Sequence, residues 1–101
     1  PLTSPDMGPK VNRPEVEKVE SIVDEAVAAG AQVLVGGRRL VEGAFAKGHW
    51  FEPTVLRVDD NRAGVMRQEI FGPVVPVMTV DGFEQALRYA NDTSYGLSAY
   101  V

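Results

Sequence analysis

The chain has 101 residues, room for one small domain, and its apolar fraction of 45% and charged fraction of 24% are typical of a globular protein. Its formal net charge is −4 with acids and bases interspersed, so the sequence predicts neither a nucleic-acid surface nor a polybasic membrane anchor, and its apolar runs are too short to span a bilayer. With no cysteine and a single histidine, His49, these residues supply no disulfide and no cysteine nucleophile, and we expect no metal site.

The first third of the chain predicts an extended lead-in followed by one long helix. Residues 1–11 hold three prolines and a glycine and are expected to be extended. Asn12 can cap a helix, and Glu15 completes a capping-box pattern three residues later. Gly30 stands where a helix terminator belongs. Apolar residues recur at helical spacing between them, at Val16, Val19, Ile22, Val23, Ala26 and Val27. The pattern predicts a helix over residues 13–29.

The middle of the chain predicts strands separated by turns. Residues 31–37 are a short β-branched run ending in two glycines, which favours a strand and a turn. Residues 38–47 show no clear periodicity and are expected to be a connection. Residues 49–58 predict extended structure interrupted at Pro53, because proline cannot donate to a strand ladder. Residues 59–64 predict a turn or a short helical entry.

The last third predicts a strand, a helix and a final strand. Residues 74–80 favour a strand in which Pro76 marks an edge or a bulge. Asp81 can cap the helix that follows, and residues 91–96 predict a turn. Residues 97–101 are expected to begin a last strand. The apolar face of the predicted helix consists of Phe83, Ala86, Leu87 and Ala90.

This order of elements predicts an α/β fold, with a partial open sheet that is partly parallel and two main helices. We expect residues 1–101 to form a single segment. Because the chain stops inside an apolar, strand-like run, we also expect that it is part of a longer protein.

Five segments, in order along most of the chain, resemble the aldehyde dehydrogenase superfamily. The most specific of them is QEIFGPVVPV. One such motif alone would be a weaker signal than five motifs that follow in the same order and at similar spacing. The segments are MGPKVN at 7–12, AGAQVLVGG at 29–37, GHWFEPTVL at 48–56, QEIFGPVVPV at 68–77 and ANDTSYGLSAYV at 90–101. The resemblance implies that the chain is part of the family's catalytic domain, downstream of its catalytic cysteine.

The resemblance implies the oxidation of a small aldehyde to a carboxylic acid with NAD or NADP as hydride acceptor. In the family a cysteine thiolate attacks the aldehyde and a glutamate activates water to release the acid. Neither group maps onto this chain, so no catalytic residue is assigned and the isolated chain is expected to be inactive. The family also implies a cytoplasmic homo-oligomer.

Two residues of the QEIFGP motif carry over to cofactor binding. Glu69 matches the glutamate that accepts hydrogen bonds from the ribose hydroxyls beside nicotinamide, a task suited to the two oxygens of a carboxylate. Phe71 matches the aromatic residue that packs beside that ribose and positions the ring. Without the resemblance, Glu69 would be interpreted as an exposed loop acid and Phe71 as a core aromatic.

Two other interpretations remain open at this point. The chain could be a non-catalytic binding or assembly module that keeps the fold without the chemistry. It could also be a plain small α/β domain with a chance EIFGP. Neither the particular aldehyde nor the choice between NAD and NADP follows from these residues.

Overall fold

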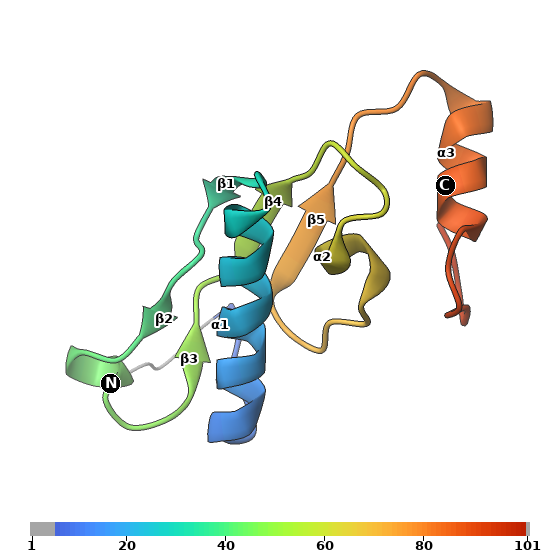
Figure 1. Cartoon of the computed structure of the whole chain (residues 1–101). Helices are drawn as coiled ribbons and strands as arrows, with labels where there is room; N and C mark the ends of the chain where they lie inside the picture. The colour runs from blue at the N-terminus through green and yellow to red at the C-terminus, as the bar shows by residue number, and fades with distance from the viewer. Residues whose placement is uncertain (1–5, 101) are drawn as a thin grey trace.

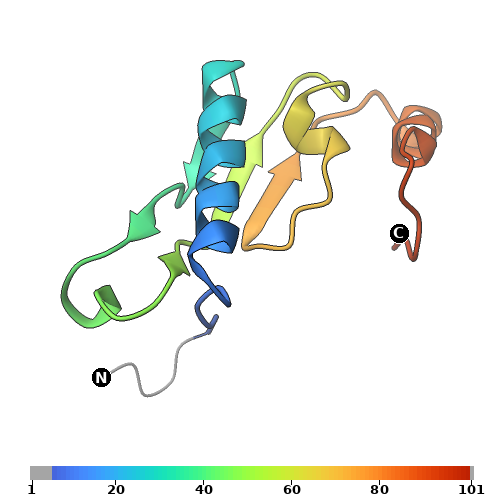
Figure 2. The same ribbon diagram turned by 60° about the horizontal axis from the view of Figure 1, so that its bottom comes forward.

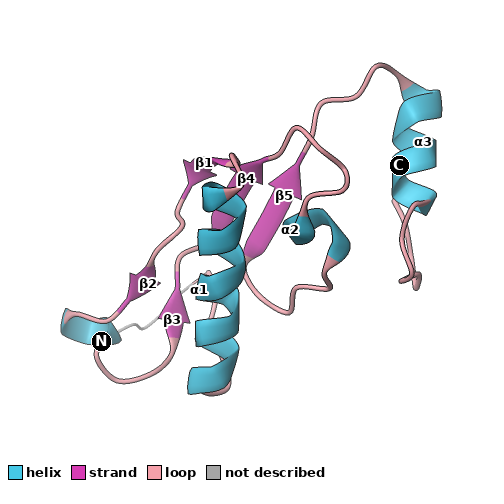
Figure 3. Cartoon of the chain, in the orientation of Figure 1, coloured by secondary structure: helices cyan, strands magenta, loops and turns pink. Residues whose placement is uncertain are grey.

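In the computed structural model, which describes residues 6–100, one long helix covers one face of a small mixed sheet (Figure 1). Figure 3 shows the same arrangement coloured by secondary structure. The elements in chain order are α1 (Arg13–Ala28), β1 (Gln32–Val35), β2 (Arg39–Leu40), the 3-10 turn η1 (Gly43–Phe45), β3 (Trp50–Phe51), β4 (Thr54–Arg57), α2 (Gly64–Arg67), β5 (Val74–Val77) and α3 (Phe83–Asn91). This arrangement confirms the predicted α/β class with a partial sheet.

Helix α1 is capped at both ends by the residues that the sequence predicts. The side chain of Asn12 accepts a hydrogen bond of 3.0 Å from the backbone N–H of Glu15. At the other end Gly30 has φ of 105°, and the N–H of Ala31 donates to the carbonyl of Ala26 at 2.9 Å. This is the hydrogen-bond pattern of a left-handed helix terminator. The helix therefore stops one residue short of the predicted 13–29.

The apolar stripe of α1 forms the main core with the sheet. Its buried members are Val16, Val19, Ile22, Val23 and Ala26. The core is completed by Phe51, Leu56, Val58, Val65 and Val74 from the strands and from α2. Val27, which the pattern places on the same stripe, is exposed because it lies at the margin of the stripe at the end of the helix.

The sheet has the strand order β1-β4-β5, with β4 antiparallel to β1 and parallel to β5. Pro53 divides the predicted run 49–58 into β3 and β4, as expected. Pro76 lies in β5, which is one of the two edge strands of this sheet among the described residues, so its missing N–H breaks no ladder. Strand β5 ends at Val77, earlier than the predicted 74–80.

The interpretation of residues 38–47 as a connection was wrong in part. Arg39 and Leu40 form β2, which pairs antiparallel with β3. The turn η1 follows, where Phe45 packs edge-to-face on Trp50 with ring centroids 5.5 Å apart. A two-residue strand has no periodicity to detect, because it is defined by its partner rather than by its own sequence.

Helix α3 stands apart from the sheet, at the end of a long connection from β5 (Figures 1 and 2). It buries no residue, and its predicted apolar face is open: Phe83 is 63% and Leu87 47% exposed. The prediction that Asp81 caps it was wrong. The N-cap is Gly82, at φ of 121°, and the side chain of Gln85 instead accepts the N–H of Asp81 at 2.6 Å.

The prediction of a final strand at 97–101 is not met over residues 97–100, which are irregular and exposed; Val101 lies outside the described residues. A strand needs a ladder partner, and residues 97–100 pair with none of the described strands. The predicted turn at 91–96 begins one residue late, because Asn91 closes α3. Of the lead-in that was predicted to be extended, residues 6–11 form no helix or strand and include bends, and 1–5 lie outside the described range.

Candidate functional site

The loop between α2 and β5 is fixed to the core by alternate residues. Ile70 packs against the core cluster from a half-buried position. Gly72 lies so close to α1 that a Cβ atom on it would come within 2.6 Å of Cγ2 of Val19. The carbonyl of Pro73 accepts the N–H of Thr54 at 2.7 Å and begins the parallel ladder of β4 and β5.

The two residues that flank Ile70, Glu69 and Phe71, face solvent. Glu69 is exposed, and Phe71 has 69% of its surface exposed, an unusual position for an aromatic side chain that could have joined the core. The loop therefore packs Ile70 against the core and exposes the two residues on either side of it. The structure places both predicted site residues on one exposed stretch of an otherwise anchored loop.

An open hollow of about 670 Å³ lies beside Glu69. Its other wall is the end of α3 and the chain that follows it. The lining residues from that wall are Ala90, Asn91, Thr93, Tyr95, Gly96, Leu97, Ser98 and Ala99. Phe71 is not among the lining residues, so Glu69 joins this hollow and Phe71 lies outside it.

Three contacts near this loop involve residues that the sequence did not single out. The ammonium of Lys10 donates to the carbonyl of Phe71, and the N–H of Lys10 donates to the carbonyl of His49 at 2.7 Å. Arg67 pairs with Asp92 across 2.9 Å. Lys10 falls in the stretch interpreted only as a lead-in, and no local pattern marks Arg67 or Asp92, because each finds its partner far along the chain.

Two charged groups away from this loop are paired at the surface. The carboxylate of Glu52 holds Arg38 at 3.1 Å and raises the pKa of its guanidinium above the ordinary value. The backbone N–H of Arg62 bonds to Asp60 and lowers the pKa of that carboxyl. Both groups are fully exposed, so these interactions order turns rather than create reactive sites.

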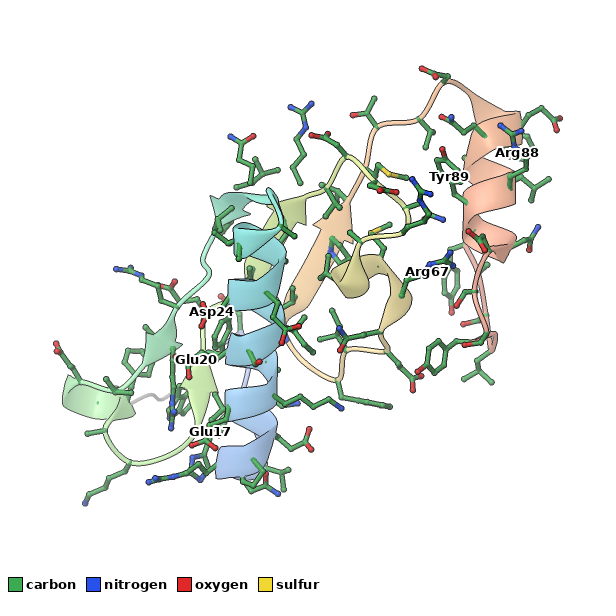
Figure 4. All side chains as sticks on the ribbon, viewed as in Figure 1. Glu17, Glu20, Asp24, Arg67, Arg88 and Tyr89 are labelled. Atoms are coloured by element: carbon green, nitrogen blue, oxygen red, sulfur yellow. The ribbon has the colours of Figure 1, made fainter. Side chains whose placement is uncertain are left out.

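The acidic residues of α1 form no site of their own. Figure 4 labels Glu17, Glu20 and Asp24, which lie along the helix. Glu20 pairs with Arg39 at 3.7 Å, and Glu17 and Asp24 are exposed. Over residues 6–100, no cluster of three or more metal-ligating side chains is found, and no helix is long and apolar enough to cross a membrane.

Comparison with known proteins identifies the family. The model of the aldehyde dehydrogenase family matches residues 1–101, the whole chain. A 3,6-anhydro-alpha-L-galactose dehydrogenase of Vibrio sp. (strain EJY3) is 48% identical over 96 residues, which are 95% of this chain and 20% of that protein. The chain thus belongs to the aldehyde dehydrogenase family, as the five motifs predicted.

Solved structures agree with this assignment. A 3,6-anhydro-L-galactose dehydrogenase in complex with NAP, an abbreviation for NADP, superposes with a TM-score of 0.87 at 49% identity, covering 91% of this chain and 19% of that one. A betaine aldehyde dehydrogenase from Staphylococcus aureus in complex with NAD+ has a TM-score of 0.87 at 38% identity, covering 94% and 19%. This chain therefore spans about a fifth of the length of the relatives it matches.

Proposed function

We propose that the chain is one segment of the catalytic domain of an NAD(P)-dependent aldehyde dehydrogenase that oxidises a small aldehyde to a carboxylic acid. Membership of the family supports the reaction, and relatives solved with NADP and with NAD+ support the cofactor class. The segment supplies no cysteine, so the nucleophile has to come from elsewhere in the protein. The isolated 101-residue chain should form no NADH from any small aldehyde.

The observation that carries the proposal is the loop at residues 68–73. Its half-buried residues fix the backbone, and its exposed residues include a carboxylate and an aromatic ring. Ribose hydroxyls need acceptors, and a sugar and a nicotinamide ring offer flat surfaces to an aromatic side chain. An exposed carboxylate and an exposed ring on a loop that is anchored to the core fit such a ligand.

In this proposal the segment positions the cofactor and leaves bond breaking to groups outside it. Nicotinamide, when bound, supplies the hydride acceptor. Glu69 accepts hydrogen bonds from both hydroxyls of the adjacent ribose, and Phe71 packs beside that ribose. The two contacts limit how the ring can turn, and orientation of this kind lowers the barrier by reducing the entropy lost on reaching the reactive geometry.

We further propose that the whole protein is a cytoplasmic homo-oligomer. Homo-oligomer formation is supported by family membership; the apolar faces that this segment leaves open can be covered by the remaining four-fifths of the same protein. The cytoplasmic location is supported by family membership alone. A non-catalytic assembly module is the alternative function, and it predicts that changes at Glu69 have no effect on cofactor binding.

The test is Glu69→Gln in the full-length protein. The substitution keeps the shape of the side chain and removes its charge, so charge-assisted hydrogen bonds worth about 1.5–3 kcal/mol weaken. We expect cofactor affinity or the rate of hydride transfer to fall roughly ten- to hundredfold, measured by stopped-flow absorbance of NAD(P)H. The matched control is Glu42→Gln, another exposed glutamate on the β2–β3 connection, which should change neither quantity. Unchanged binding and transfer in Glu69→Gln would reject the role of Glu69.

A further inference from the structure

The C-terminal part of the described chain is hydrogen-bonded to the rest through one residue. Helix α3 buries none of its residues, and residues 92–100 are all exposed. Within residues 6–100, every hydrogen bond from 83–100 to a residue before 81 ends on Asp92. The hydrogen bonding between this wall of the hollow and the preceding elements therefore runs through Asp92 alone.

Those contacts form a small cluster of three side chains. Nη2 of Arg67 lies 2.9 Å from Oδ2 of Asp92, and Nδ2 of Asn61 donates to the same oxygen at 3.2 Å. Nη1 of Arg67 donates to the backbone carbonyl of Asp92. Figure 4 shows Arg67 between α2 and α3.

This geometry restrains direction as well as distance. The planar guanidinium of Arg67 uses two of its nitrogens on two different oxygens of Asp92, so it fixes the turn more narrowly than a single ion pair does. Asn61 is 9% exposed, so the surrounding protein restricts its side chain independently of its hydrogen bond to Asp92. The cluster thus connects a buried residue to the turn that follows α3.

The cluster lies next in the chain to both walls of the hollow, although none of its three residues lines the hollow itself. Arg67 closes α2 and precedes Glu69 by two residues, on the loop that carries the outward-facing pair. Asp92 follows α3 and directly precedes the segment 93–99 that lines the opposite wall. One guanidinium therefore sets the spacing between Glu69 and the segment across from it.

We propose that Arg67, Asn61 and Asp92 are positioning residues that hold segment 93–99 opposite Glu69 and so shape the cofactor-side hollow. This inference rests on the proposed function of Glu69. The cluster makes no contact with the reacting atoms and acts through the two walls. Breaking it lets the C-terminal wall move away while the main core, which contains neither Arg67 nor Asp92, stays intact.

The experiment is a double-mutant cycle in the full-length enzyme with Arg67→Ala, Asp92→Ala and the double variant. The measured quantities are KM for the cofactor, KM for the aldehyde, kcat and the melting temperature. We expect each single variant to raise KM for the cofactor about tenfold, and the double variant to do no more than either single one, because partners in one cluster couple. The melting temperature should change little.

Two further variants separate positioning from general damage. Arg67→Lys keeps the charge and one donor to Asp92, so it should restore part of the cofactor affinity lost in Arg67→Ala. Asp59→Asn removes a neighbouring exposed ion pair, with Arg57 at 3.6 Å, and should leave KM for the cofactor unchanged. If Asp92→Ala fails to fold, Asp92→Asn replaces it in the cycle, because asparagine keeps the shape of the aspartate side chain.

The outcomes distinguish this inference from the proposed function. Additive effects in the cycle, or no effect on the cofactor KM beyond that of Asp59→Asn, overturn the inference. If Glu69→Gln still weakens the cofactor in that case, the proposed function stands alone. If Glu69→Gln is silent, the proposed function fails, and the inference fails with it.

Discussion

At the scale of single residues, the candidate site depends as much on the residues that anchor the loop 68–73 to the core as on the exposed residues of that loop. Glu69 and Phe71 can face a ligand only because their neighbours are anchored. Gly72 is the tightest of these anchors, since its backbone lies against Val19 of α1. A residue that contacts no ligand therefore sets where the two candidate ligand-binding side chains stand.

Gly72→Ala tests this dependence. Its Cβ would lie 2.6 Å from Cγ2 of Val19, so either the loop or α1 has to shift, and overpacking of this kind costs about 1–3 kcal/mol. We expect a lower melting temperature and a higher KM for the cofactor in the full-length protein. Adding Val19→Ala makes room for the new methyl group and should recover cofactor affinity.

The matched control is Gly64→Ala in α2, where the nearest atom to a new Cβ is Nε2 of Gln68 at an ordinary 3.5 Å. This change should be neutral or stabilising, because alanine is the better helix former. Normal stability and normal cofactor affinity in Gly72→Ala would contradict the close packing of the loop on α1.

At the scale of elements, α1 is the helix most completely specified by its own sequence. Asn12→Ala removes the acceptor for the N–H of Glu15 and should lower the free energy of unfolding by about 0.5–2 kcal/mol. Asn12→Ser keeps an acceptor oxygen and should retain most of that stability. Urea unfolding followed by circular dichroism measures both variants, and an unchanged free energy of unfolding in Asn12→Ala would show that the cap contributes nothing.

The elements that the sequence predicted well are those decided by local contacts. The caps and the apolar stripe of α1, the break at Pro53 and the edge position of Pro76 all follow from nearby residues. The pairing of β2 with β3 was missed because two residues carry too little pattern. The cap at Asp81 was wrong because the helix begins one residue later, with Gly82 at the N-cap position. The strand predicted at 97–101 is not met over 97–100, which lack a ladder partner among the described strands.

The candidate site divides in the same way. Glu69 and Phe71 were found through a motif contiguous in sequence, and their assignment to the cofactor remains a prediction. Lys10, Arg67 and Asp92 were missed, since their partners are 61 and 25 residues away and no periodicity connects them. Contacts of that span appear only once the chain is folded.

At the scale of the whole molecule, the described chain exposes apolar surface that a stable domain would cover. On the outer face of the sheet Val35 is 56%, Val75 57% and Val77 39% exposed, and the apolar face of α3 is open as well. Val35 and Val75 flank Val55 in one row across the three strands. Each exposed apolar Å² costs about 25 cal/mol relative to burial, so these surfaces favour any partner that covers them.

We therefore expect the isolated chain to associate with itself or to be only marginally folded as a monomer. Edge strands β1 and β5 add unpaired backbone groups to the exposed valines, and such edges pair readily with other chains. Sedimentation at several concentrations should show a rising average mass, and the thermal melt should broaden or shift with concentration. Val75→Lys places a charge on the outer face without touching the α1 core, so it should reduce association while the helical circular dichroism is retained. A compact monomer at high concentration, with a sharp melt independent of concentration, would instead show that α1 and this small sheet already form a self-sufficient folding unit, and that the valine row is tolerated in water.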